Sequence, residues 1–150
     1  HKGYLPAAII ALACSVGLHL AISLMLVLKA DDWFQPQLLI PLAGMYFANT
    51  MNAISLAAER YHSEVHNGQT KDKARLSAFH AAMIPQINSL LAVGIVALPG
   101  MMTGQILSGV SPLIAVRYQI MIMAMILGTA GMGAALMLWL LARRKKTVIP

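Results

Sequence analysis

Asparagine, serine and glutamate residues recur at helical spacing between residues 49 and 59, at the end of a long apolar stretch. On an ideal α-helix, where successive residues are about 100° apart, four of them share an arc of about 120°. They are Asn49, Asn52, Ser55 and Glu59. Polar groups are costly in lipid, so this polar stripe should face protein or water. It could line a solute pathway or make hydrogen bonds between helices, and the spacing leaves both interpretations open.

A second candidate region is the run of 41 residues from Leu76 to Val116, which contains no Asp, Glu, Lys or Arg. As one helix it would be about 60 Å long, roughly twice the hydrocarbon thickness of a bilayer, so the helix must break. Proline lacks a backbone N–H and glycine lets the chain turn, so Pro99 and Gly100 predict the position of the break. We expect a helix from about residue 84 to 98, an interrupted segment, and a non-helical turn around residues 108–112.

Interrupted helices in transporters present backbone groups to a solute where they line a cavity. We therefore predict that the break and the polar residues before it belong to the solute pathway, with a plain proline kink as the alternative. The predicted members are Asn88, Ser89, Pro99, Gly100, Met101, Met102, Thr103, Gly104 and Gln105.

Other residues with reactive or ligating side chains form weaker patterns. His62 and His66 have the i, i+4 spacing of a chelating pair, but no third ligand is evident, which favours a solvated face. His19 is alone in an apolar stretch, so it is either functional or neutral and hydrogen-bonded. The 11 methionines favour packing over a Cu(I) site. There is no phosphate-binding loop and no zinc signature, so we expect no enzymatic activity from this chain.

The elements that must position these residues are membrane-spanning helices. The chain is 59% hydrophobic and only 11% charged, against about 25% charged in soluble domains. Four windows reach the roughly 20 apolar residues that a span needs: residues 4–28, 34–58, a part of 76–116, and 118–142. The predicted fold is all-α, a polytopic transmembrane domain over residues 1–150 with four spans, the third of them broken, within a larger permease bundle.

The distribution of Lys and Arg predicts the orientation, because short cytoplasmic loops are rich in both. Four spans place nine basic residues on one side and only Lys29 and Arg117 on the other, so the first side should be cytoplasmic. The nine are Lys2, Arg60, Lys71, Lys73, Arg75, Arg143, Arg144, Lys145 and Lys146. The polar segment 59–80 would be a cytoplasmic loop. Because the basic residues flank apolar spans, the net charge of +6 does not indicate nucleic-acid binding.

Small residues in the last predicted span have spacings that allow close helix packing. The pairs Ala124/Gly128 and Gly131/Ala135 are four residues apart, which lets two helix backbones approach. This pattern predicts a tight contact with another helix or subunit. The chain begins with His1 and lacks a signal-peptide layout, and we expect it to be a piece of a longer protein.

Several motifs resemble the FetB-type permease family. They are ALPGMMTGQIL at residues 97–107, RYQI at 117–120, IPLAGM at 40–45 and AAMIP at 81–85, the last followed by Asn88 and Ser89. The resemblance is strong over residues 39–127. It implies a membrane subunit of an ABC exporter in the bacterial inner membrane, linked to iron or another metal ion. It further implies a permease homodimer on two cytosolic ATPase subunits, which would bind ATP and Mg²⁺, while this chain binds no cofactor.

The same resemblance suggests where the ATPase would couple. Relatives have a longer stretch between residues 64 and 84, with an element similar to a coupling helix, and this chain is shorter there. The charged residues that remain as coupling candidates are Glu59, Arg60, Glu64 and Arg75.

Three alternatives stay open. Plant relatives of the family are tied to aluminium tolerance, which implies an ABC permease for a nucleotide sugar or another small solute linked to metal tolerance. A passive channel or a structural membrane subunit would fit the same composition. An intramembrane enzyme using His19 is weaker, because no second ionisable residue shares its depth. The spans contain no carboxylate cluster for hard ferric iron, so iron as the cargo follows from the resemblance alone.

Overall fold

The computed structural model describes residues 4–27, 36–95 and 99–143, and within these ranges every secondary-structure element is a helix. The elements are α1 (Leu5–Ala21), the π-helical turn η1 (Ile22–Val27), α2 (Pro36–His66), α3 (Lys71–Ile95), α4 (Gly100–Leu107) and α5 (Pro112–Arg143). The predicted all-α class is confirmed.

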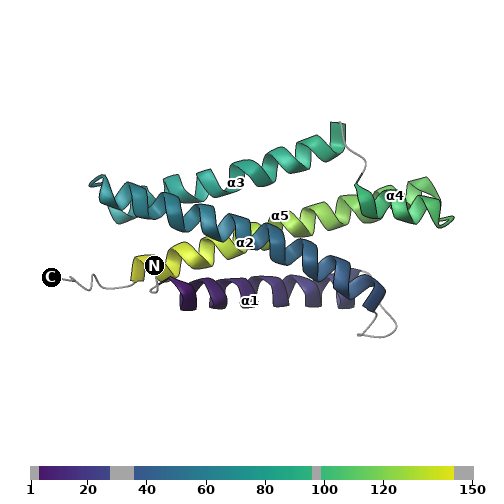
Figure 1. Ribbon diagram of the computed structural model, residues 1–150, viewed down its shortest axis with the longest axis horizontal. Helices are drawn as coiled ribbons and strands as arrows, with labels where there is room; N and C mark the ends of the chain where they lie inside the picture. The colour runs from purple at the N-terminus through teal and green to yellow at the C-terminus, as the bar shows by residue number, and fades with distance from the viewer. Residues whose placement is uncertain (1–3, 28–35, 96–98, 144–150) are drawn as a thin grey trace.

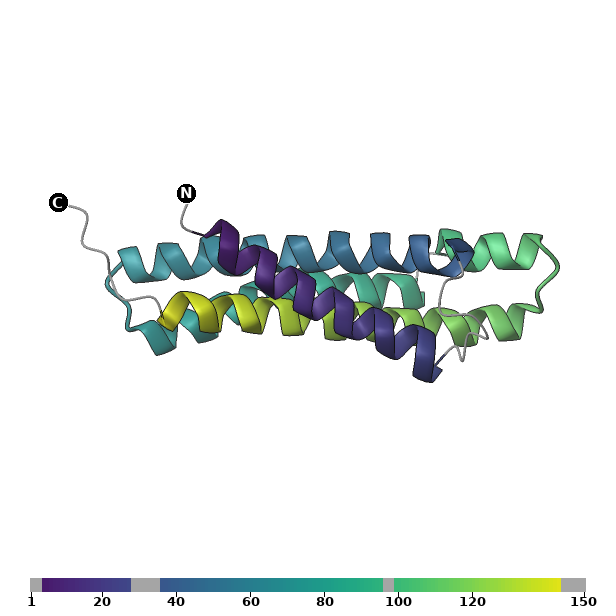
Figure 2. The same ribbon diagram turned by 90° about the horizontal axis from the view of Figure 1, so that it is seen from below.

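The long helices run along a common axis and alternate in direction (Figures 1 and 2). α2 and α5 form the centre: α2 packs against α5, α3 and α1, and α5 also contacts α1 and α3. The start of α1, the α2–α3 turn and the end of α5 lie at one end of the bundle, on the left in Figure 1. The short helix α4 and the turn that joins it to α5 lie at the other end. The segments that we predict to be cytoplasmic therefore share one end.

Alanine makes most of the central packing. Ala53 and Ala57 on α2, Ala78 on α3, and Ala130 and Ala134 on α5 are all completely buried. The two alanines of α2 are four residues apart, and so are the two of α5, so each pair forms a small-residue face on its helix. Such faces let helix backbones approach closely without the hydrophobic effect that drives packing in water.

Three helices of the described residues are long and apolar enough to cross a membrane: Leu5–Met25, Lys71–Val93 and Pro112–Arg143. The predicted count was four. α2 has 31 residues and is long enough, but the asparagines and the charged residues of its second half lower its mean hydropathy. Membrane insertion of α2 therefore remains a prediction.

Most of the segment 59–80, the predicted cytoplasmic loop between two spans, is helical, and its cytoplasmic position stays a prediction. It consists of the end of α2, a turn at residues 67–70 and the start of α3. Gly68 ends α2 with a positive φ of 82°, a conformation that glycine adopts without a Cβ penalty. α3 begins at Lys71 with Asp72 in its first turn, where a negative charge stabilises the helix N-terminus.

The break also differs from the prediction in its details. Pro99 is extended, with φ −64° and ψ 140°, and α4 begins immediately after it at Gly100. The segment that we expected to be irregular is thus a helix of eight residues. The turn at residues 108–111 agrees with the predicted one and contains Gly109 at φ 91°. Residues 96–98 lie outside the described residues, and a single interrupted span through them stays a prediction.

Candidate functional site

The predicted polar stripe lines a groove between α2 and α3. The groove has a volume of about 520 Å³ and opens to the surface. α2 contributes Asn49, Asn52, Ser55 and Glu59, and α3 contributes Ser89, so the structure brings together five of the predicted site residues. Leu56, Pro85 and Gln86 complete the lining.

The side chains of the polar stripe differ in burial and in whether they hydrogen-bond to the backbone of α2. The Asn49 amide is half-buried and its Nδ2 donates to the Met45 carbonyl at 2.8 Å, one turn back on α2. Asn52, Ser55 and Glu59 are exposed. These three polar groups therefore face the groove rather than the packed centre of the bundle.

Gln86 is a groove residue that the sequence analysis missed. Its side chain is only 6% exposed, and it lies three residues before Ser89, on the same face of α3. Asn88 is exposed and does not line the groove. Adjacent residues on a helix are about 100° apart, so Ser89 and Asn88 cannot both point to α2. The i, i+3 spacing of Gln86 and Ser89 was the signal that could have found Gln86.

The predicted residues 99–105 do not line this groove. They belong to Pro99 and α4, at the end of the bundle away from the α2–α3 turn (Figure 1). Thr103 donates its Oγ1 hydrogen to the Pro99 carbonyl at 3.1 Å, within its own helix. Met102 is buried, and Met101 packs against the apolar cluster around Tyr46 and Ile122. Gly100, Gly104 and Gln105 are placed on α4 as well.

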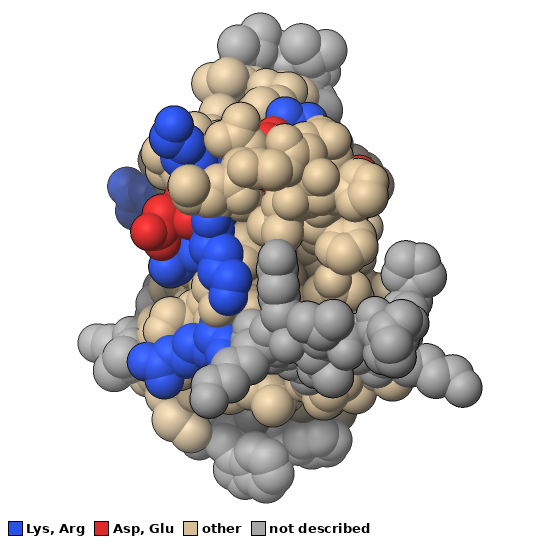
Figure 3. All heavy atoms as spheres, turned by 90° about the vertical axis from the view of Figure 1, so that its left-hand side faces the viewer, with Lys and Arg blue, Asp and Glu red and all other residues tan. Residues whose placement is uncertain are grey.

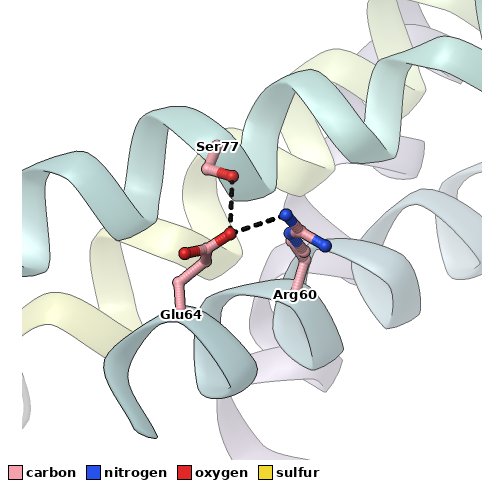
Figure 4. A network of polar contacts seen from close by, with 3 residues as sticks. All are labelled: Arg60, Glu64 and Ser77. Atoms are coloured by element: carbon pink, nitrogen blue, oxygen red, sulfur yellow. Dashed lines mark hydrogen bonds and ion pairs between the residues drawn. The ribbon is translucent and has the colours of Figure 1, made fainter. Parts of the chain in front are cut away.

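The four coupling candidates divide into separate contacts. Arg60 and Glu64 form an ion pair of 2.7 Å within α2, and Ser77 on α3 donates a hydrogen bond of 3.0 Å to the same carboxylate oxygen (Figure 4). Glu64 is 16% exposed, so this three-residue network joins α2 and α3 at a largely protected place. Arg75 lies 3.8 Å from Asp72 on the surface, and Glu59 lines the groove.

The same end of the bundle is basic. Figure 3 views this end and shows Lys and Arg side chains gathered along it, with fewer Asp and Glu. Lys71 Nζ donates to the Ala142 carbonyl at 3.2 Å, and the Arg143 guanidinium lies 3.8 Å from the centre of the Trp139 ring. Cations at the last turn of α5 stabilise its C-terminus. The Lys71 hydrogen bond joins α3 to α5 at the predicted cytoplasmic side, and the Arg143–Trp139 contact lies within α5.

His19 lies in the contact between α1 and α5. Its Nδ1 is 3.0 Å from the Ser15 carbonyl, and its Nε2 would lie 2.8 Å from a Cβ placed on Gly128. Gly133 is packed even more tightly, with Thr50 Cγ2 only 2.5 Å from the position of a Cβ. Gly128 and Gly133 therefore accommodate side chains of α1 and α2, whereas Ala124 and Ala135 of the predicted pairs are exposed, so the role of the four-residue spacing stays a prediction.

Metal ligands do not gather into larger groups: across residues 4–27, 36–95 and 99–143, no three His, Cys, Asp or Glu side chains are placed to hold one ion. The groove between α2 and α3 offers amides, hydroxyls and one carboxylate. Such a lining can replace part of the hydration shell of a polar or charged solute, and it contains no nucleophile paired with a base.

Comparison with known proteins places this architecture in a family. The family model described as "Uncharacterised protein family (UPF0014)" matches residues 1–78 and 69–145. The chain belongs to the UPF0014 family. A UPF0014 membrane protein of Synechocystis is 39% identical over 135 residues, which is 80% of this chain and 52% of that protein. The probable iron export permease protein FetB of Escherichia coli is 33% identical over 150 residues, 90% of this chain and 57% of FetB. Protein ALUMINUM SENSITIVE 3 of Arabidopsis thaliana is 32% identical over 112 residues, 65% of this chain and 41% of that protein.

The chain spans about half the length of these curated UPF0014 relatives. The FetB alignment is 150 positions long but takes up 90% of this 150-residue chain, which is 135 residues, so about 15 positions have no counterpart here. The two stretches of the family match overlap at residues 69–78, beside the α2–α3 turn. The shorter segment expected after residue 64 stays a prediction. No solved structure matches this chain.

Proposed function

We propose that this chain is part of the membrane permease of an ABC exporter, and that its solute moves along the groove between α2 and α3. The observation that carries the proposal is the groove itself. Six polar side chains from two helices converge there, in a bundle whose outer surface is otherwise rich in exposed apolar residues such as Ile9, Ile40 and Leu91. Polar groups are costly next to lipid, so a polar groove in such a surface is expected where a solute passes.

A metal ion is the proposed cargo. Two relatives carry names that refer to metals, iron for FetB and aluminium for the Arabidopsis protein. The groove supplies the oxygen atoms of amides, hydroxyls and the Glu59 carboxylate, which are suitable for a hydrated or complexed cation. A free ferric ion would require more carboxylates than this lining provides, so we favour a partly hydrated or ligand-bound ion.

ATP hydrolysis would take place on a separate cytosolic subunit, with this chain as the membrane half of a permease homodimer in the bacterial inner membrane. The basic end of the bundle supports this arrangement, because Lys and Arg in short loops mark the cytoplasmic side. The Arg60–Glu64–Ser77 network lies at that end and joins the two helices that border the groove. A movement of the ATPase against this end would therefore reach both walls of the groove.

Transport into inverted vesicles tests the proposal. Vesicles would contain the full-length permease and its ATPase, with ATP present or absent, and uptake of iron would be measured. ATP-dependent uptake that falls in the Asn52→Leu variant at unchanged protein level would support the groove as the pathway. Uptake that is independent of ATP would indicate a channel, and uptake that Asn52→Leu leaves intact would reject the groove.

A further inference from the structure

A second pocket lies between the start of α1 and α2. It adjoins the groove between α2 and α3, because Glu59 lines both. It has a volume of about 600 Å³ and is lined by Tyr4, the residue just before α1, and by Ala58, Glu59, His62, Ser63 and His66 from α2. Both histidines of the i, i+4 pair thus face one cavity, and both are exposed.

The segment is helical, which is the condition that a chelating pair requires. α2 continues through His66, so His62 and His66 are neighbours on one helix face, one turn apart. Two histidines at this spacing can ligate one transition-metal ion, as in the metal-binding helices of zinc proteases. Imidazole nitrogen suits the divalent ions of zinc, iron, nickel and copper.

Tyr4 provides the support that metal-bound histidines need. Its hydroxyl oxygen lies 3.0 Å from His62 Nδ1, and the two rings meet edge to face at 73°. With the proton on Nδ1, that N–H donates to the Tyr4 oxygen and leaves the Nε2 lone pair free for a metal. A hydrogen bond of this kind fixes both the tautomer and the ring orientation of a ligating histidine.

We propose that His62 and His66 bind one divalent transition-metal ion in this pocket, with Tyr4 as a positioning residue and water completing the coordination. Glu59 is one turn before His62 and adds a negative charge to the pocket wall, which favours a cation. The proposal concerns equilibrium binding, and it holds whatever solute the permease exports.

Titration of the full-length protein with Zn²⁺ tests the site, after purification without a histidine tag and treatment with a chelator. We expect one Zn²⁺ per chain, with affinity reduced at least tenfold in His62→Ala and in His66→Ala. The double variant His66→Val/Asn67→His keeps the number of imidazoles but breaks the i, i+4 spacing, and it should lose affinity equally. Tyr4→Phe keeps the ring and removes the hydroxyl, and a loss of roughly tenfold is expected from a second-sphere partner.

His80→Ala is the matched control, because His80 is an exposed histidine on α3 that does not line the pocket. It should bind Zn²⁺ as the unaltered protein does. The proposal is overturned if the unaltered protein binds no Zn²⁺, if His80→Ala loses as much affinity as His62→Ala, or if His66→Val/Asn67→His retains full affinity. Because no ATP and no transport enter the measurement, its failure would leave the proposed export function untouched.

Discussion

The two ends of the bundle differ in the polar contacts that join their helices. At the end with the α2–α3 turn, charged and polar side chains are bonded across helices: Ser77 to Glu64, and Lys71 to the end of α5. At the other end, the Thr103 hydroxyl bonds to the Pro99 carbonyl, the Ser23 hydroxyl in η1 bonds across to the Tyr46 hydroxyl on α2, and large apolar residues are exposed, with Leu107 at 83% and Leu113 at 64%. Charged side chains therefore join helices at the first end, whereas the helix-joining bond at the second end is between uncharged hydroxyl groups.

Labelling from outside the cell tests this difference most directly, because its result is all or none. Gln69 lies in the α2–α3 turn and Ser111 in the α4–α5 turn, and both are exposed. With Cys14 replaced by serine, an impermeant thiol reagent should label Ser111→Cys and leave Gln69→Cys unlabelled, because the basic end is predicted to be cytoplasmic. Permeabilised cells provide the control, in which both should react.

The opposite labelling pattern would mean that the α2–α3 turn lies outside the cell and the α4–α5 turn inside. Labelling of both positions from outside would contradict an arrangement in which the two turns lie on opposite sides of the membrane.

A larger side chain should destabilise the packed centre of the bundle far more than the end that contains α4. Gly133→Val places a Cβ that meets Thr50 Cγ2 at 2.5 Å, whereas nothing lies within 4 Å of a Cβ on Gly104 in α4. Overpacking of a close contact typically costs about 1–3 kcal/mol, so Gly133→Val should lower the thermal stability of the purified protein markedly. Gly104→Val is the control and should change it little. Equal stability of the two variants would mean that α2 and α5 are not packed as described.

Much of this contrast could be predicted from the sequence, and part of it could not. The apolar composition predicts the helical class. The helical period predicts the stripe from Asn49 to Glu59, and glycine and proline predict the turn near residue 109. For the predicted cytoplasmic loop 59–80 the sequence left open whether it is helical, and in the structure α2 and α3 continue into it. Gln86 was missed because the predicted face runs through both Asn88 and Ser89, whereas Gln86 lies beside Ser89 on the side of the helix away from Asn88.

The separation of α4 from the groove has a different cause. An ideal helix would place Asn88, Ser89 and Thr103 on one side, but Pro99 is extended and a new helix begins at Gly100. A helical phase cannot be carried across such a break, so the position of Thr103 relative to α2 depends on tertiary contacts with α5. Those contacts leave no local signal in the sequence.

Transport should depend on the groove and not on the outer face of the same helix. Asn52→Leu removes a polar group from the groove lining, while Met51→Leu changes an adjacent exposed residue that does not line it. Loss of one or two polar contacts to the solute, each worth about 1 kcal/mol, predicts roughly tenfold slower export for Asn52→Leu and normal export for Met51→Leu. Export and membrane level would be measured on the same vesicles. A parallel loss of protein level and export would mean that Asn52 acts in folding instead.

The smallest expected effect concerns the hydrogen bond between α2 and α3. Ser77→Ala removes the donor to Glu64 but leaves the Arg60 ion pair in place, so the carboxylate keeps one partner. A hydrogen bond to a charged group contributes about 1.5–3 kcal/mol, and the remaining ion pair should reduce the loss to about 1 kcal/mol. Ser108→Ala is the matched change at the apolar end, where the hydroxyl donates to Gly104 in its own helix and is exposed. The unfolding temperature should therefore fall by a few degrees in Ser77→Ala and hardly at all in Ser108→Ala. If both serines cost the same, the hydrogen bond across α2 and α3 would add no more stability than a bond within one helix, and the two ends would differ in composition but not in how firmly their helices are joined.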